Sequence, residues 1–77
     1  MFAAVRFQVD ADASPGLLPR LLQPFARRDL MPDYFHSVQA DGIVSVGIRM
    51  DAMPCEMVNL VAGNLWQVVG VRQVVTT

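Results

Sequence analysis

The spacing of apolar residues changes repeatedly along this sequence, and the order of the changes limits the folds available to it. Residues 2–10 (FAAVRFQVD) alternate between apolar and polar, which is typical of a strand with one buried face. Residues 14–28 carry apolar side chains at helical spacing, residues 33–50 alternate again, residues 51–70 return to helical spacing, and residues 71–77 (VRQVVTT) predict a last strand. This order predicts an α+β fold of the ferredoxin-like βαββαβ type, with a four-stranded antiparallel sheet and two helices on one face.

The first predicted helix has a favourable start and prolines inside it. Ser14 is a good N-cap, and Pro15 stands at the first helical position, where proline is common. Pro19 falls in the first turn, whose N–H groups lack helical acceptors in any case. Pro24 lies deeper, so we expect a kink or a loosened turn there before the helix ends near Arg28.

The dipeptide Asp41-Gly42 suits a two-residue type I′ turn and predicts a hairpin. Such a turn pairs residue 40 with 43, 39 with 44 and 38 with 45, and so decides which side chains share a face. One face is predicted to carry Phe35, Ser37, Gln39, Val44, Val46 and Ile48, and the other Tyr34, His36, Val38, Ser45, Gly47 and Arg49.

The second helix is predicted to begin near Asp51 or Ala52, with Pro54 in its first turn, and to stop at Gly70. Its apolar stripe is predicted to consist of Met57, Val61, Leu65 and Val68.

With 77 residues there is room for a single domain, residues 1–77, that buries only about 60% of its unfolded surface. Because 53% of the residues are hydrophobic and 17% are charged, we expect an apolar surface that a partner chain covers, in a homodimer. The net charge of −1 argues against nucleic-acid binding. No apolar run approaches the roughly 18 residues of a membrane span, and the N-terminus does not look like a signal peptide, so we expect a cytoplasmic protein.

Few residues suit catalysis or metal binding. Cys55 and His36 are the only soft ligands, so no metal site or other cofactor is expected. Neighbouring strand residues point to opposite faces, so the geometry is poor for a base–nucleophile pair of His36 and Ser37, and no catalytic residue is predicted. Since all six basic residues are arginine, lysine Schiff-base chemistry is excluded, and Cys55 is expected to be a small buried packing residue.

The loop before the first helix is the best candidate for binding. In the stretch DASPGLL, Gly16 lets the main chain approach a ligand closely, and a helix N-terminus offers N–H groups and a positive dipole end. These properties suit the carboxylate of a small ligand such as an amino acid. A plain capped turn with no ligand is the alternative.

Residues 14–30 (SPGLLPRLLQPFARRDL) resemble the P-G-x-L…F-A-R-R signature that opens ACT domains. Residues 64–74 (NLWQVVGVRQV) resemble their closing stretch, in which a helix leads into a valine-bearing strand. The likeness extends over nearly the whole chain and is most similar to the short small (regulatory) subunits of acetolactate synthase. It implies a non-catalytic module that binds an amino acid or pairs chains and regulates an enzyme of branched-chain amino acid biosynthesis.

The resemblance also implies where a ligand would lie. ACT domains commonly dimerise side by side into an eight-stranded sheet with effector sites at the seam. Their second ligand contact is often the asparagine of an R-G-x-N-I pattern; here Met31 occupies that position and Asp29 replaces the glycine, so activation of a catalytic partner is implied more strongly than feedback by valine. The ligand loop of the family corresponds to Asp12, Ala13, Ser14, Pro15, Gly16 and Leu17.

Other functions stay open at this point. A small ferredoxin-like enzyme could use His36, Tyr34 and Arg49 on the open sheet face. A ligand-free oligomerisation module is the third possibility, and in that case Leu17→Arg would disrupt assembly. In either dimeric case we expect pairing through the edge formed by the first strand and a helix.

Overall fold

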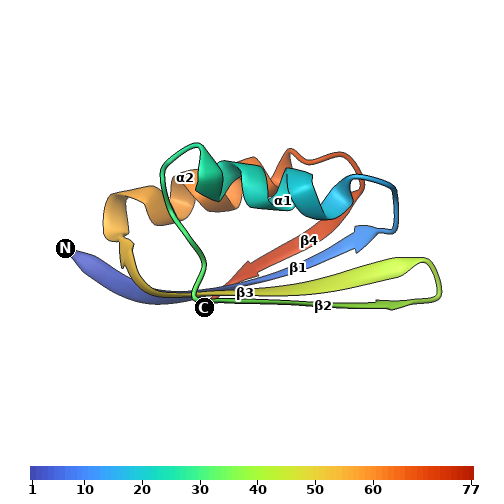
Figure 1. Cartoon of the computed structure of the whole chain (residues 1–77), viewed down its shortest axis with the longest axis horizontal. Helices are drawn as coiled ribbons and strands as arrows, with labels where there is room; N and C mark the ends of the chain where they lie inside the picture. Colours follow the sequence, from blue (N-terminus) through green and yellow to red (C-terminus); the bar gives the residue numbers. More distant parts are fainter.

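The computed structural model describes residues 1–77 and has the predicted order of elements (Figure 1). A four-stranded antiparallel sheet with the strand order β2-β3-β1-β4 carries both helices on one face. The ferredoxin-like βαββαβ prediction is therefore confirmed. The elements are β1 (Phe2–Asp12), α1 (Leu17–Ala26), β2 (Tyr34–Ala40), β3 (Ile43–Pro54), α2 (Cys55–Trp66) and β4 (Val71–Thr76).

The hairpin has the predicted turn and register. Asp41 and Gly42 both have positive φ, at 55° and 77°, as a type I′ turn requires. Ala40 pairs with Ile43, and the pairing continues without a shift to Tyr34 and Arg49. The two predicted faces of the hairpin are therefore correct, and the face with Val44, Val46 and Ile48 points toward the helices.

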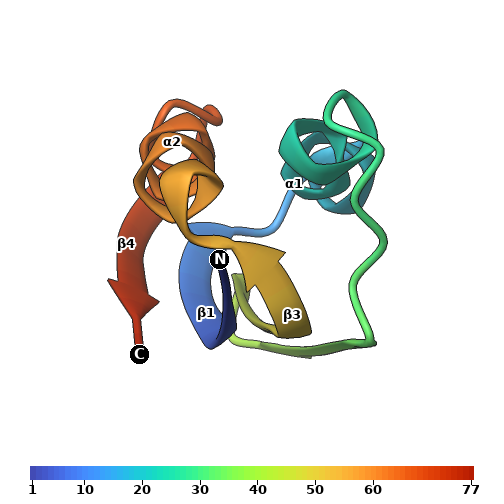
Figure 2. The same cartoon turned by 90° about the vertical axis from the view of Figure 1, so that its left-hand side faces the viewer.

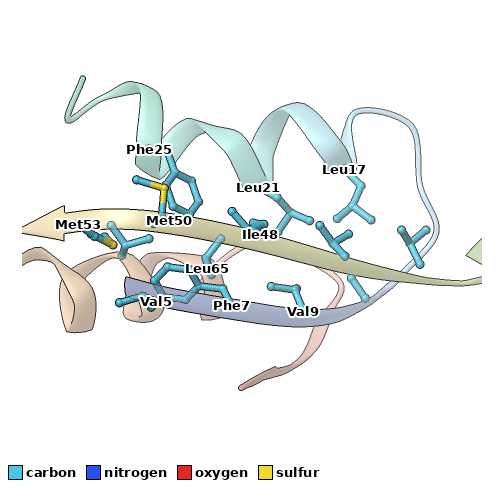
Figure 3. Packing of buried hydrophobic residues seen from close by; sticks show 14 residues of the cluster. Val5, Phe7, Val9, Leu17, Leu21, Phe25, Ile48, Met50, Met53 and Leu65 are labelled. Atoms are coloured by element: carbon cyan, nitrogen blue, oxygen red, sulfur yellow. The ribbon is translucent and has the colours of Figure 1, made fainter. Parts of the chain in front are cut away.

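The core lies between the sheet and the helices and contains only apolar side chains (Figure 3). Phe7 of β1 and Phe25 of α1 meet in it edge to face, with ring centroids 5.7 Å apart. From α2, Val61 and Leu65 are fully buried, as the predicted stripe requires. The fourteen buried apolar residues are Val5, Phe7, Val9, Ala11, Leu17, Leu21, Phe25, Val44, Val46, Ile48, Met50, Met53, Val61 and Leu65.

The start of α1 differs from the prediction. Gly16 has φ of 79°, a left-handed conformation that no helical residue adopts, so the helix begins at Leu17. The prediction that the Ser14 side chain caps the helix is wrong: only its main-chain carbonyl takes part, accepting a hydrogen bond from the Leu17 N–H at 3.3 Å. Pro15 therefore belongs to the preceding turn and not to the helix.

The end of α1 agrees with the prediction. The helix continues through Pro24 without the loosened turn expected there, its last helical residue is Ala26, and the chain leaves the helix near Arg28. The N–H of Leu30 donates to the Phe25 carbonyl and the N–H of Asp29 to that of Ala26, which together make a Schellman motif. Asp29 has φ of 55°, the left-handed conformation that this motif requires and that glycine most often supplies.

One arginine side chain ties the end of α1 to α2. Arg28 Nη1 donates to the Pro24 carbonyl and Nη2 donates to Asn64 Oδ1, both at 2.9 Å. The main-chain N–H of Arg28 donates to Phe25 instead, so the guanidinium replaces the donor that a continuing helix would give to Pro24. The two helices are thus joined by a half-buried, charge-assisted contact.

Replacing Arg28 with alanine should lower the free energy of unfolding by about 1–2 kcal/mol, because hydrogen bonds from a charged group are lost at a half-buried position. Arg27→Ala is the matched control: Arg27 is exposed, its side chain makes no hydrogen bond, and its loss should change stability by less than about 0.5 kcal/mol. Urea denaturation of both variants measures the difference. Equal losses in the two variants would show that the Arg28 contacts contribute nothing.

The second helix starts later than predicted. β3 continues to Pro54, past a register shift in its pairing with β1, and keeps Met53 fully buried opposite Ala3. The helix therefore begins at Cys55, whose N–H donates to the Met1 carbonyl at 3.0 Å. The expectation of a buried cysteine is wrong, since Cys55 is exposed.

The second helix also ends earlier than predicted. It stops at Trp66, and Gly70, with φ of 94°, lies in the loop that follows, where its carbonyl accepts a hydrogen bond from the Asp12 N–H.

The free edges of the sheet are β2 and β4. β1 is hydrogen-bonded to β3 on one side and, from Phe7 onward, to β4 on the other, so the first strand is not the free sheet edge that the predicted mode of dimerisation assumed. Dimerisation itself stays a prediction. In Figure 2, α2 lies over β4 and β1, whereas α1 lies on the side of β3. Neither helix has the length and apolar character needed to cross a bilayer.

Candidate functional site

A hollow of about 260 Å³ lies where the β1–α1 loop meets the hairpin. The loop approaches this end of the sheet because the N–H of Ala13 donates to the Gly42 carbonyl at 2.8 Å. On the other side, Asp12 closes an exposed ion pair with Arg72 of β4, with Oδ1 and Nε 2.7 Å apart. The hollow is lined by Ala13, Ser14, Gly16, Leu17, Leu18, Pro19, Ser37, Gln39 and Val44.

Gly16 shapes the rim of this hollow. A Cβ added at Gly16 would lie 3.5 Å from an Nη of Arg20, which is ordinary contact, so the left-handed φ and not crowding calls for glycine here. The turn that Pro15 and Gly16 form lets α1 begin directly over the inner faces of Ser37 and Gln39.

The hollow is lined mostly by apolar side chains, carries a few polar groups and has no charge. Ser14, Ser37 and Gln39 contribute hydroxyl and amide groups, and no lining side chain is ionisable. The helix N-terminus adds fewer donors than expected. The Leu17 N–H is bonded to the Ser14 carbonyl and Pro19 has no N–H, so the free N–H groups here are those of Gly16 and Leu18. Such a lining suits a small, neutral or zwitterionic ligand held by a few hydrogen bonds.

The structure brings together most of the residues of the predicted ligand loop. Ala13, Ser14, Gly16 and Leu17 line the hollow, and Pro15 lines a shallower adjoining one with Gln39. The remaining two lie apart: Asp12 is at the end of β1, bonded to Arg72, and Met31 is 84% exposed in the loop after α1. Met31 borders an apolar groove of about 400 Å³ formed with Leu22, Phe25, Ala26, Asp29, Leu30 and Pro32.

Ser37 and Gln39 are the polar lining residues that the sequence analysis did not name as binding residues. The sequence could have identified them, because the predicted register already placed Ser37 and Gln39 on the same face as Val44 and Val46. Polar side chains on the helix-facing side of a strand mark a place where the core ends and a cavity begins.

The open face of the sheet gathers a different set of side chains. Tyr34, His36 and Arg49 lie together there, as predicted, around a hollow of about 470 Å³. Ser37 lies on the opposite face, so the predicted lack of a Ser37–His36 pair is confirmed. No group of three or more histidine, cysteine, aspartate or glutamate side chains is placed to hold a metal ion.

Comparisons with known proteins agree with the observed fold. The model of the ACT-like domain family matches residues 2–77. The ACT domain from GTP pyrophosphokinase of Chlorobium tepidum has a similar structure, with a TM-score of 0.84 at 13% identity over 100% of both chains. The uncharacterized protein TM1266 from Thermotoga maritima is similar too, with a TM-score of 0.81 at 10% identity over 100% of this chain and 96% of that one. No curated protein matches the sequence significantly.

Proposed function

Because the chain belongs to the ACT-like domain family, we propose that it is a non-catalytic regulatory module that dimerises and binds an amino-acid effector in the hollow of the β1–α1 loop. The enzyme it regulates is, in this proposal, acetolactate synthase of branched-chain amino acid biosynthesis. The observation that carries the proposal is the position of the hollow: its polar lining comes from the loop and from β2, which is a free edge of the sheet.

The free edge of β2 explains how a dimer would complete the site. Pairing of two β2 edges side by side would place the hollows of both copies at the seam, since Ser37 and Gln39 belong to β2. The apolar groove bordered by Met31 is formed by α1 together with the loop that leads into β2, so we expect the same pairing to cover part of it. This arrangement would bury part of the exposed apolar surface that the composition predicts.

The choice of acetolactate synthase rests on the sequence signature in residues 14–28. Asp29 replaces the glycine of the family pattern but has φ of 55°, the left-handed conformation that a glycine at this position would adopt. The replacement of glycine by aspartate therefore leaves the local chain path intact. Met31 offers no hydrogen-bonding side chain, so binding of the effector depends on the loop and on β2.

An assay of the catalytic subunit of acetolactate synthase from the same host tests the proposal, with and without this chain and with valine, leucine or isoleucine. Stimulation that one of these amino acids reverses is the expected result. Stimulation without inhibition would mean that the module activates but has lost its effector. No stimulation would exclude acetolactate synthase as the target.

Gln39→Ala tests the hollow directly. Gln39 is exposed and makes no hydrogen bond within the chain, so the fold should not change, whereas the effector should bind about tenfold more weakly. Gln73→Ala makes the same chemical change on β4, at the opposite edge of the sheet; it is the control and should bind normally. Isothermal titration with the amino acid that acts in the assay measures both. Equal affinity in the two variants would place the effector elsewhere.

If no amino acid binds while the chain still dimerises, the module serves oligomerisation alone. Leu17→Arg does not test that alternative, because Leu17 is only 2% exposed and a charge there would disrupt the core.

A further inference from the structure

The open face of the sheet carries two arginines in direct register without a carboxylate between them. Arg6 of β1 pairs with Arg49 of β3, and like charges directly opposite each other on one face destabilise a sheet. Arg49 pairs in turn with Tyr34 of β2, which gives a row of three side chains across the sheet. The next row consists of Gln8, Gly47 and His36.

These two rows surround the hollow of about 470 Å³, which is within the range of small-molecule sites. Its floor is low because Gly47 has no side chain between Gln8 and His36. None of the residues that line it is acidic: they are Arg6, Gln8, Tyr34, His36, Gly47, Ile48 and Arg49.

Most of the hydrogen-bond donors around the hollow are unused. Arg6 makes no salt bridge and no side-chain hydrogen bond. Asp51 engages only Nε of Arg49, at 3.1 Å, which leaves both terminal nitrogens of that guanidinium free. The nearest carboxylate in the following row, Asp10, already accepts a hydrogen bond from Ser45 at 2.9 Å. The free donors therefore favour an anion.

The aromatic side of the hollow is ordered. The Arg49 guanidinium lies 5.3 Å from the centre of the Tyr34 ring, and the rings of Tyr34 and His36 are stacked at 16° with centroids 6.1 Å apart. Tyr34 is 50% exposed, so part of this aromatic pair is open to solvent next to the two arginines. Arginine pairs suit phosphate oxygens, and exposed aromatic rings suit planar bases.

We propose that this face binds a small phosphorylated ligand with a planar ring, of which a nucleoside monophosphate is the simplest kind. Arg6 and Arg49 hold the phosphate, while Tyr34 and His36 lie against the ring. The site is on the opposite side of the sheet from the β1–α1 hollow, so it is independent of the amino-acid site proposed above.

Titration of the chain with AMP, followed by isothermal calorimetry and by NMR shifts of the Gly47 amide, tests this site. AMP should bind saturably and less tightly as salt is added. Adenosine and inorganic phosphate should each bind at least about tenfold more weakly than AMP, because each makes only one of the two contacts.

Gly47→Val is the most informative variant. Gly47 has no left-handed φ, and a Cβ there would lie 3.6 Å from Gln8 Oε1, an ordinary contact, so the strand should tolerate valine and gain β propensity. The branched side chain raises the floor of the hollow between Gln8 and His36, and AMP affinity should fall at least about tenfold while thermal stability stays the same or rises. Arg6→Gln should weaken AMP similarly.

Arg72→Gln is the control, because it removes an equal charge from an exposed position outside the hollow. It should leave AMP affinity within about twofold of the parent, since only general attraction changes. The proposal is overturned if AMP does not bind saturably, if adenosine or phosphate alone binds as tightly, or if Gly47→Val binds AMP normally. Gln39→Ala should not change AMP affinity, because Gln39 lies at the other hollow. A negative result with AMP would therefore not count against the proposed amino-acid site.

Discussion

Phe7→Ala is expected to leave most of the chain unfolded at room temperature. Phe7 is fully buried in the central strand β1 and packs edge to face on Phe25, which is 1% exposed. Truncating a buried phenylalanine costs about 3–5 kcal/mol through lost burial and the cavity that remains. A single core in a domain of this size rarely supplies more than about 3–5 kcal/mol, so the change removes nearly all of the stability.

Circular dichroism during urea denaturation measures this effect. Phe2→Ala is the matched control, since Phe2 lies on the same strand but is 67% exposed, and its loss should shift stability by less than about 0.5 kcal/mol. Phe7→Leu keeps most of the volume and should stay folded with a loss of about 1.5 kcal/mol or less, which makes the cost measurable. A folded Phe7→Ala variant of near-normal stability would show that a partner chain and not this core holds the fold.

Val38→Lys should convert the proposed dimer into a monomer. Val38 is 51% exposed on β2, the free edge at which side-by-side pairing is proposed, and lysine on an edge strand opposes pairing with a second strand. In a twofold-symmetric interface each charge occurs twice, and like charges brought together cost several kcal/mol. The dissociation constant of the dimer should therefore rise by about a hundredfold or more.

The other free edge supplies the control. Val75 is 40% exposed on β4, so Val75→Lys makes the same chemical change at the opposite side of the sheet. Sedimentation of both variants over a range of concentrations should give a monomer for Val38→Lys and a dimer for Val75→Lys. The reverse result would assign the interface to β4, and two unchanged dimers would exclude both edges.

How far the sequence predicts this structure depends on the kind of feature. The hairpin register followed from Asp41-Gly42 alone, because a two-residue type I′ turn determines which residues of the two strands pair with each other. The same register also assigned side chains to the two faces of the sheet. Ser37 and Gln39 lie on the face covered by the helices, and Tyr34, His36 and Arg49 lie on the open face. Local periodicity is sufficient for these features because neighbouring residues impose them.

The ends of the helices were less predictable. Ser14 and Asp51 both look like helix caps, yet one helix starts after the left-handed Gly16 and the other after a longer β3. Met53 decides the second case: as a strand residue opposite Ala3 it is fully buried, and that burial outweighs a local preference for an earlier helix. A boundary set by long-range packing leaves no local pattern in the sequence.

The sequence by itself determined the order of the elements and the faces of the hairpin, and it singled out the loop from Ala13 to Leu17 as the candidate ligand loop, because these depend on residues close together in the chain. Only the tertiary structure decided that β1 is central and β2 free, that Gln39 joins Ser14 around one hollow, and that Arg6 stands beside Arg49 on the other face. Those relations come from strand pairing between distant segments, which is selected by burial of the whole apolar core and not by any short stretch.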